Sequence, residues 1–263
     1  MNYRPSTLYR QKLPNTIKEQ IYDAIGKGIA SAGNTPIQLF FRADDIGVPS
    51  ASFTEMIHLF QKHQTPLCLA TVPSWLTSSR FRQLEAITGH EPNQWCWHQH
   101  GRLHKNFEPE GKKQEFGPAR DYQQLMEQLD KGKTRLQSIL DDRFIPFFTP
   151  PWNRCSEDTI RALKRLEFKG LSRSAGAQPD STPLLPDIQV NVDLHTRKET
   201  DPAKVLNDIL NELEQTLANG RTGIMLHHQR MNTTALLFLD LILACLTQYT
   251  NIRPMLLQDF IQP

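Results

Sequence analysis

Two short segments of the sequence hold four side chains whose types and spacing suit a hydrolytic metal centre. Asp44 and Asp45 follow an apolar run that ends at Phe41, and His100 and His104 come later in the chain, four residues apart. A catalytic metal ion takes three protein ligands and keeps a position for water, and a further carboxylate must accept the proton of that water. The four residues meet both needs, so they predict a mononuclear hydrolytic metal site.

Each pair also has an ordinary structural explanation. An Asp-Asp pair after a strand often caps the next helix or forms an Asx turn, and a histidine-rich loop can simply be solvated. His98 adds an alternative, because it would share a strand face with His100 if the strand continued. The functional interpretation rests on the combination. Asp44 and Asp45 point to different sides of a strand end, so one can bind metal while the other faces substrate; two histidines four residues apart share one face of a helical turn and can bind one ion.

Two further segments place candidate side chains after apolar runs. In residues 150–154, two prolines fix the backbone and Trp152 offers a flat apolar surface on which a sugar ring can stack. His227 and His228 follow the apolar run 222–226, and one of them is a candidate general acid. The alternative for these histidines is a structural role at the edge of the core.

Hydrophobic periodicity predicts strands in alternation with helices. The predicted strands cover residues 37–41, 66–72, 95–97, 144–149, 170–174, 188–194, 222–226 and 254–257. The predicted helices cover residues 15–32, 49–63, 77–88, 120–140, 201–218 and 233–249, and a further one begins at Ser156. Residues 103–118 have no apolar period and predict a long loop, which in a compact domain is usually functional or mobile.

This alternation predicts an α/β fold with a parallel sheet and outer helices, most economically an incomplete or distorted (β/α) barrel. Active sites of such barrels lie at the carboxyl ends of the strands. The polar candidates all lie at or just after the ends of predicted strands, which is the main argument from the residues alone for an enzyme. They are Asp44, Asp45, His100, Trp152, Asn153, Asp193, His227 and His228.

Length and composition narrow the class of protein. A chain of 263 residues can bury a full core as one domain, and a net charge of +2 does not indicate a nucleic-acid partner. The four cysteines have no Cys-x-x-Cys spacing and predict buried free thiols of a reducing compartment. The first fifteen residues lack the apolar core of a signal peptide, and no apolar run is long enough to span a bilayer. We therefore expect a cytoplasmic protein.

Four motifs resemble, in order, those of the polysaccharide deacetylase (NodB-homology) family, and the resemblance spans about residues 37 to 260. The first two motifs are specific in combination, and the later two are looser. The motifs are Phe41-Arg42-Ala43-Asp44-Asp45-Ile46-Gly47, His100-Gly101-Arg102-Leu103-His104, Thr149-Pro150-Pro151-Trp152-Asn153 and Ile224-Met225-Leu226-His227.

The resemblance implies a distorted (β/α)7-type barrel of the glycoside hydrolase–deacetylase-like class over residues 37–263. Residues 1–36 would form an N-terminal arm and a helix that packs on the barrel or mediates a dimer. The implied activity is a metal-dependent hydrolase that removes an acetyl group from an N-acetylated sugar or sugar-containing precursor, with a metal-bound water as nucleophile. The implied cofactor is a divalent metal, zinc first, although cobalt, nickel, manganese or iron can use the same ligands.

Carried onto this sequence, the resemblance makes Asp44 the catalytic base and His227 the general acid. It makes Asp45, His100 and His104 the metal ligands. The remaining site residues are expected to contact a carbohydrate or another acetylated small molecule. They are Pro151, Trp152, Asn153, Arg154, His228 and Asp193. His228 is also an alternative to His227 as the general acid, and Asp193 corresponds to the aspartate of a further family motif.

The sequence also departs from the family pattern. The usual Thr-Phe-Asp-Asp-Gly is replaced by Arg-Ala-Asp-Asp-Ile-Gly, which is similar to diacetylchitobiose-deacetylase-like barrels. The arginine that usually opens the proline motif and orients the base is Phe148 or Thr149, and Arg154 or Arg173 can replace it in space. Two alternatives follow: a metal-binding barrel that binds a glycan or scaffolds a partner without catalysis, and a hydrolase of a non-sugar C–N bond. The lack of a secretion signal favours a soluble precursor over peptidoglycan or chitin.

Overall fold

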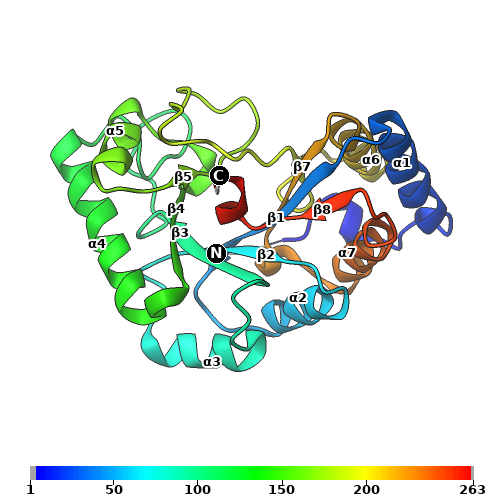
Figure 1. Cartoon of the computed structure of the whole chain (residues 1–263), viewed down its shortest axis with the longest axis horizontal. Coiled ribbons are helices and arrows are strands. Elements are labelled where there is room, and N and C mark those ends of the chain that lie inside the picture. The colour runs from blue at the N-terminus through cyan, green and yellow to red at the C-terminus, as the bar shows by residue number, and fades with distance from the viewer. Residues whose placement is uncertain (1–3, 262–263) are drawn as a thin grey trace. The chain divides into compact units, whose positions relative to one another are not determined.

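Runs of buried apolar residues form the strands, and amphipathic segments form the helices between them. The computed structural model describes residues 4–261 (Figure 1). The strands are β1 (Ile37–Ile46), β2 (Leu67–Thr71), β3 (Trp95–His100), β4 (Phe144–Thr149), β5 (Gly170–Leu171), β6 (Val192–Asp193), β7 (Arg221–Leu226) and β8 (Ile252–Pro254). The α-helices are α1 (Ile17–Ala32), α2 (Ala51–Lys62), α3 (Ser78–Thr88), α4 (Tyr122–Leu140), α5 (Glu157–Arg165), α6 (Pro202–Ala218) and α7 (Thr233–Leu246). Short 3-10 helices are η1 (Thr7–Arg10), η2 (Asp141–Arg143), η3 (Pro151–Asn153), η4 (His228–Arg230) and η5 (Leu257–Phe260).

Side-chain caps mark where most of the α-helices begin. The oxygen of each capping residue accepts a hydrogen bond from a backbone N–H of the first turn, which otherwise has no partner inside the helix. Ser156 caps α5 in this way, as its position in the sequence predicts. The other capping residues are Ser50, Thr77, Asp121, Asp201 and Asn232. Local sequence thus determines these helix starts.

The chain forms two compact units. The first contains the residues up to Ala43, Ser50–Leu67 and Asn191–Met255. The second contains Asp44–Pro49, Cys68–Val190 and the residues from Leu256 onward. Strand β1 contributes to both, with its last three residues in the second unit.

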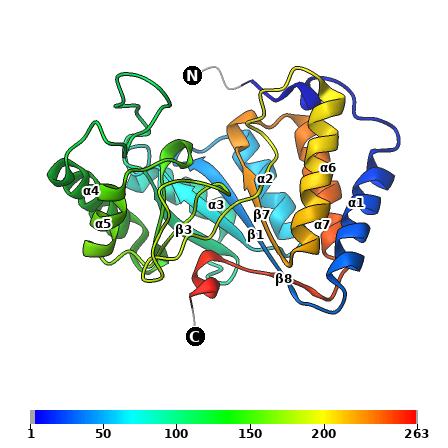
Figure 2. The same cartoon turned by 90° about the horizontal axis from the view of Figure 1, so that it is seen from above.

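In the first unit, four parallel strands lie in the order β8-β1-β7-β6. Helix α1 packs along α6 and contacts α7 (Figure 2). Gly28 permits the close approach of α1 to α6, because a Cβ at this position would lie 2.6 Å from the carbonyl oxygen of Glu214. The N-terminal segment is also anchored, since Tyr9 is buried against Phe238 and its carbonyl accepts a hydrogen bond from Asn232.

In the second unit, the strands lie in the order β2-β3-β4-β5, with parallel pairing of β3 to β4 and of β4 to β5. The end of β1 joins this unit beside β2, where the Val72 N–H donates to the carbonyl of Ile46 over 2.8 Å. Helices α4 and α5 lie side by side (Figure 1). They pack on a buried cluster that includes Leu125, Leu129 and Phe148.

Several predicted elements differ from the structure. The strand predicted over 170–174 is reduced to Gly170–Leu171, and the strand predicted over 254–257 is replaced by β8 at Ile252–Pro254, since η5 begins at Leu257. Strand β1 continues to Ile46, so Asp44 and Asp45 lie within its end rather than after it. The strand predicted over 188–194 is reduced to Val192–Asp193, because the preceding residues form only isolated bridges. Residues 100–104 form no helical turn, since β3 ends at His100 and an irregular bend follows.

The prediction about the cysteines is borne out. The four cysteines are buried and free, as predicted. Within residues 4–261, none of the helices combines the length and apolar character needed to cross a membrane.

Candidate metal and catalytic site

Three side chains of the second unit converge at and just beyond the carboxyl ends of β1 and β3. Nε2 of His104 lies 3.0 Å from Oδ1 of Asp45, and Nε2 of His100 lies 3.4 Å from the same oxygen. One candidate ligand atom from each residue falls within 4.8 Å of the other two. The structure therefore brings together the three residues that the sequence predicts as metal ligands.

The spacing and chemistry of these atoms fit a divalent ion. Ligand atoms about 2.0–2.1 Å from one tetrahedral zinc ion lie about 3.3 Å from each other. The two distances to the Asp45 oxygen, 3.0 and 3.4 Å, are close to this value. Asp45 is only 4% exposed and His100 only 2%. A buried carboxylate is costly unless it is paired or bound to a metal, so a cation at this point would lower that cost.

The surroundings of His100 favour a positive charge at the point where its ring faces Asp44 and Asp45. Burial lowers the pKa of His100, but Asp45, Asp44 and the Thr149 carbonyl raise it, and the net pKa lies above its ordinary value. Nδ1 of His100 lies 2.9 Å from the Thr149 carbonyl oxygen, which leaves Nε2 to face Asp45. Such an outer hydrogen bond is typical of metal-binding histidines, because it fixes the ring and its tautomer. Asp44, 2% exposed, is thus a second buried carboxylate within electrostatic reach of His100.

Unusual backbone conformations are concentrated around this cluster. Asp45, His104, Trp152 and Asn153 have φ values of 65°, 54°, 57° and 59°. They are four of the seven residues other than glycine that have positive φ in the described part of the chain. Non-glycine residues avoid this region, and such strain persists at functional sites where surrounding contacts impose it. The distribution makes this end of the second unit the candidate functional site.

Two tryptophans flank His104. The ring centroid of Trp152 lies 4.8 Å from that of His104, and the ring centroid of Trp75 lies 5.4 Å from it. Both indoles are partly exposed. Trp152 is a predicted substrate-binding residue, whereas Trp75 is not among the residues predicted from the sequence. Its signal is its position shortly after β2, where a loop of a barrel reaches the active site. Nδ1 of His104 has no hydrogen-bond partner among residues 4–261.

A buried carboxylate supports the segment that carries His104. Glu115 is 0% exposed, and its two oxygens accept hydrogen bonds from the backbone N–H groups of Arg102, Leu103 and His104. Burial raises the pKa of Glu115, and the three N–H donors and His104 lower it, with a net increase. Nothing in the sequence singles out Glu115, because it lies in a polar loop without periodicity.

The segment 150–154 packs on the same turn. A Cβ on Gly101 would lie 2.5 Å from Cγ of Pro151, and Gly101 itself has a φ of 57°. Pro151 therefore forms a wall beside the His100–His104 bend. Trp152 and Asn153 complete the short helix η3, and the Arg154 guanidinium donates to the carbonyl of Lys113.

Arg173, a sequence candidate for the base-orienting arginine, is held by other groups in the second unit. Its guanidinium forms an ion pair with Asp187 at 2.8 Å and donates to the carbonyl of Pro179. It also lies 3.8 Å from the sulfur of Cys155. These contacts explain how an arginine with 0% exposure is accommodated.

The remaining predicted site residues belong to the first unit. Asp193 accepts hydrogen bonds from the backbone N–H groups of His195 and Thr196 and orders the turn after β6. The backbone N–H of His227 lies 3.3 Å from Nδ1 of His195, and Nδ1 of His227 has no hydrogen-bond partner among the described residues. His228 is 1% exposed, and its ring contacts the edge of Phe53.

His195 is a buried histidine that no sequence motif singles out. Burial, followed by the nearby His227, lowers its pKa to about 3, so the ring is neutral at physiological pH. Because Nδ1 accepts the N–H of His227, the proton of the neutral ring is on Nε2. The sequence signal for His195 is its position two residues after Asp193, directly after the predicted strand 188–194.

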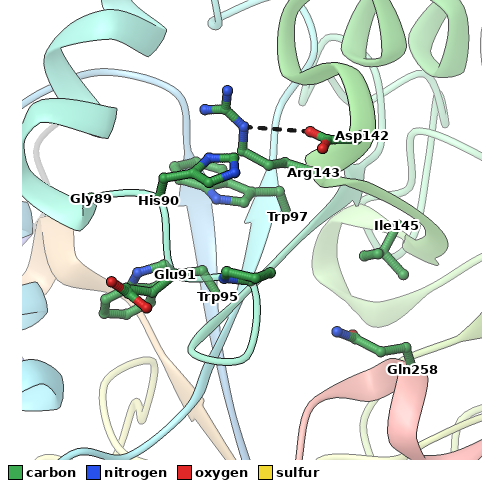
Figure 3. A pocket seen from close by; sticks show the side chains of 10 residues that line it. Gly89, His90, Glu91, Trp95, Trp97, Asp142, Arg143, Ile145 and Gln258 are labelled. Atoms are coloured by element: carbon green, nitrogen blue, oxygen red, sulfur yellow. Dashed lines mark ion pairs between the residues drawn. The ribbon is translucent and has the colours of Figure 1, made fainter.

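A separate pocket of about 140 Å³ lies at the opposite, amino ends of β3 and β4 (Figure 3). Trp95 and Trp97 line it, but they are only 4% and 2% exposed, so little aromatic surface is available to a ligand. The Arg143 guanidinium at its edge is already paired with Glu85 and lies 3.8 Å from Asp142. The pocket therefore has the features of imperfect packing rather than of a binding site. It lies at the amino ends of the strands, whereas barrel active sites lie at the carboxyl ends.

Comparison with known proteins relates the fold to one group of enzymes. No protein-family profile matches the sequence, and no curated protein matches it. A structure assigned as a polysaccharide deacetylase from Mycobacterium smegmatis matches with a TM-score of 0.61 at 14% identity, over 87% of this chain and 90% of that chain. A family 4 carbohydrate esterase from Streptomyces lividans, in complex with acetate, matches with a TM-score of 0.52 at 10% identity, over 85% and 93%.

A CE4 family pseudoenzyme from Bacillus anthracis also matches, with a TM-score of 0.53 at 12% identity, over 83% of this chain and 63% of that chain. At these identities the likeness is one of fold. It confirms the predicted fold, a distorted (β/α)7-type barrel of parallel strands and helices, which is the fold of the polysaccharide deacetylases.

Proposed function

We propose that this protein, which has the fold of the polysaccharide deacetylases, is a metal-dependent hydrolase that removes an acetyl group from an N-acetylated sugar or a sugar-containing precursor. The observation that carries the proposal is the convergence of His104 with the buried residues Asp45 and His100, with the buried Asp44 as the adjacent carboxylate. The fold match alone would be compatible with many chemistries, because function depends on the site rather than on the fold.

Asp45, His100 and His104 would hold the divalent ion, with zinc as the first candidate. A bound ion of this kind supplies a Lewis acid that polarises a carbonyl group and lowers the pKa of water. The hydrogen bond from His100 to Thr149 and the hydrogen bonds from the His104 segment to Glu115 keep both imidazoles oriented. Cobalt, nickel, manganese and iron remain candidates, because the same donor set binds them.

Asp44 is assigned the role of general base. Its carboxylate is buried and adjacent to a proposed ligand, yet it is not part of the three-residue cluster. In this role Asp44 takes one proton from water while the water oxygen bonds to the acetyl carbon. Cleavage of the C–N bond then releases acetate and an amine. Proton transfer of this kind typically contributes about 10²–10⁴-fold to the rate.

His227 is assigned the role of general acid, which gives a proton to the departing amine. The assignment rests on the resemblance of residues 224–227 to the last motif of the polysaccharide deacetylase family. Nδ1 of His227 makes no hydrogen bond within residues 4–261, so the ring is not committed to a structural contact through that atom.

Carbohydrate as the substrate class is supported by the aromatic surfaces beside His104. Trp75 and Trp152 are partly exposed indoles, and sugar rings bind against such surfaces. Pro151, Asn153 and Arg154 would complete the same wall, and His228 and Asp193 are assigned to substrate contacts from the resemblance alone.

A second candidate function is a metal-binding barrel without catalysis. It is favoured by one observation: Arg173, an available substitute for the base-orienting arginine, is engaged by Asp187. A pseudoenzyme with this fold also exists in the CE4 family. A third candidate, hydrolysis of a non-sugar C–N bond, uses the same residues and differs only in the substrate.

Two measurements on the purified protein test these proposals. The first is the metal content of the wild type and of Asp45→Ala; we expect near-stoichiometric metal in the wild type and its loss in the variant. The second is acetate release from a panel of N-acetylated sugars and non-sugar amides. Metal binding without acetate release from any substrate would select the non-catalytic alternative. A wild type that binds no divalent metal after reconstitution would contradict the hydrolase proposal.

A further inference from the structure

Glu115 lies in a loop between β3 and α4, yet its carboxylate reaches the backbone next to a proposed metal ligand. Oε1 accepts the N–H of Leu103 over 2.7 Å and that of Arg102 over 3.2 Å. Oε2 accepts the N–H of His104 over 2.9 Å. Three consecutive backbone N–H groups therefore converge on one carboxylate, which is the arrangement of an anion-binding nest with its anion supplied by the protein.

The bend held by this carboxylate has a strained geometry. Gly101 and His104 have φ values of 57° and 54°, and only the first is a glycine. Hydrogen bonds from N–H groups to a carboxylate are shorter and stronger than those to neutral acceptors. Glu115 thus supplies three hydrogen bonds that can offset the conformational cost of the bend from Arg102 to His104, in addition to the bond from the Ser74 N–H to the Arg102 carbonyl.

Glu115 is itself held rigidly. The next residue, Phe116, is 0% exposed and forms a parallel bridge with Cys155. The carbonyl of Phe116 accepts hydrogen bonds from the N–H of Ser156 and the hydroxyl of Thr159, each over 2.8 Å. The backbone beside Glu115 is therefore fixed to the start of α5, so the position of the carboxylate does not depend on the polar loop around it.

The same loop contains a carboxylate that provides a comparison. Oε1 of Glu108 accepts the N–H of Ala119 over 3.2 Å and so orders the loop itself. No hydrogen bond joins the Glu108 side chain to residues 100–104 among the described contacts. Glu108 and Glu115 thus lie in the same loop and accept the same type of hydrogen bond. They differ in the segment that they stabilise, which is the loop itself for Glu108 and residues 102–104 for Glu115.

We propose that Glu115 is a positioning residue of the metal site: its carboxylate fixes the Arg102–His104 backbone so that Nε2 of His104 faces Oδ1 of Asp45. This inference rests on the proposed metal site and adds a residue from a loop that bears none of the recognised motifs. Glu115 acts through His104 and does not contact the ion. Loss of such supporting partners typically weakens metal binding about 10–100-fold.

The test is a titration with Co²⁺ alone, followed by the visible absorption of the bound ion. The proteins are the wild type, Glu115→Gln, Glu115→Asp and Glu108→Gln. Glutamine keeps the size of the side chain but presents an N–H₂ group to backbone donors, and we expect Co²⁺ affinity to fall about 10–100-fold with an altered spectrum. Aspartate keeps the charge on a shorter side chain and should recover part of the affinity. Glu108→Gln should bind Co²⁺ like the wild type.

The outcomes separate this inference from the proposed function. If the wild type binds no Co²⁺, the metal site and the role of Glu115 both fail. If the wild type binds Co²⁺ and folded Glu115→Gln binds it with the same affinity and spectrum, only the role of Glu115 is overturned. Equal losses in Glu115→Gln and Glu108→Gln would likewise overturn it, since the effect would then come from the loop as a whole. If Glu115→Gln does not fold, Glu115→Asp decides: an unchanged affinity and spectrum overturn the role, and a weakened, altered site supports it.

Discussion

Oδ1 of Asp45 lies 3.0 Å from Nε2 of His104, and both residues have positive φ. A residue with positive φ interrupts the regular alternation of side chains along an extended chain. Asp45 is such a residue at the end of β1, and His104 is another in the bend after β3. The contact is thus formed by two local departures from regular backbone, one at the end of β1 and one after β3.

Asp44→Asn should reduce the rate of acetate release by about 10²–10⁴-fold, because the amide cannot accept the proton of the attacking water. Metal affinity should remain near that of the wild type, since Asp44 is not one of the three clustered ligands. The check is kcat alongside metal content for the same preparation. Normal turnover in Asp44→Asn would show that Asp44 is not the base.

Asp45→Asn should abolish stabilisation by added zinc. Metal that binds only the folded state raises the free energy of unfolding, by about 2.7 kcal/mol at a free concentration one hundred times Kd. We expect thermal unfolding of the wild type to shift upward with zinc and downward with a chelator. The melting temperature of Asp45→Asn should respond to neither, and an equal zinc-dependent shift in this variant would remove Asp45 from the ligand set.

Gly101→Ala should destabilise the fold and weaken the metal site together. The new Cβ would meet the Glu115 carboxylate and Pro151 at a φ of 57°, which an alanine adopts only with strain. The expected cost is about 1–3 kcal/mol in the free energy of unfolding. Gly111→Ala is a matched control, because Gly111 has a φ of 76° but nothing within 4 Å of the added Cβ. Urea unfolding and Co²⁺ affinity of both variants check the prediction, which fails if the two behave alike.

His195→Gln should reduce the sensitivity of the protein to acid. Burial and neighbouring cationic groups lower the pKa of His195 to about 3 in the folded state, whereas an unfolded histidine titrates near 6.5. Between these values only the unfolded chain binds the proton, so the stability that His195 contributes is complete above about pH 6.5 and is lost as pH falls toward 3. One such proton gives a slope of at most about 1.4 kcal/mol per pH unit.

The free energy of unfolding, measured in urea from pH 7 to pH 4, checks this expectation. The slope should be smaller in His195→Gln than in the wild type. His58→Gln is the control, because His58 is an exposed histidine of the same unit. An unchanged slope in His195→Gln would mean that His195 is protonated in the folded protein.

Much of the fold could be predicted because its signals are local. The apolar run of β4 and the helical spacing of α4 are each contained within about twenty residues, and both elements form where the sequence predicts them. The strand predicted over 188–194 is longer than the observed one, because Asp187 and Val190 form only isolated bridges and alternation alone does not distinguish a bridge from a paired strand.

The sequence also predicts part of the chemistry of the candidate site. An Asp-Asp pair and two histidines four residues apart are recognisable from residue type and spacing, so the sequence by itself determined which side chains can bind a metal ion. It did not determine how they meet, because the bend from His100 to His104 is irregular rather than helical.

Tertiary structure alone decided which residues support them. Glu115 and Trp75 come from loops whose sequences have no period, and their roles arise from hydrogen bonds and ring contacts to distant backbone and side chains. A pattern of residue types reports on which face of a strand or helix a side chain lies. It carries no information about a carboxylate that folds back onto three backbone N–H groups, because every sequence offers those N–H groups equally and only the path of the chain brings them together.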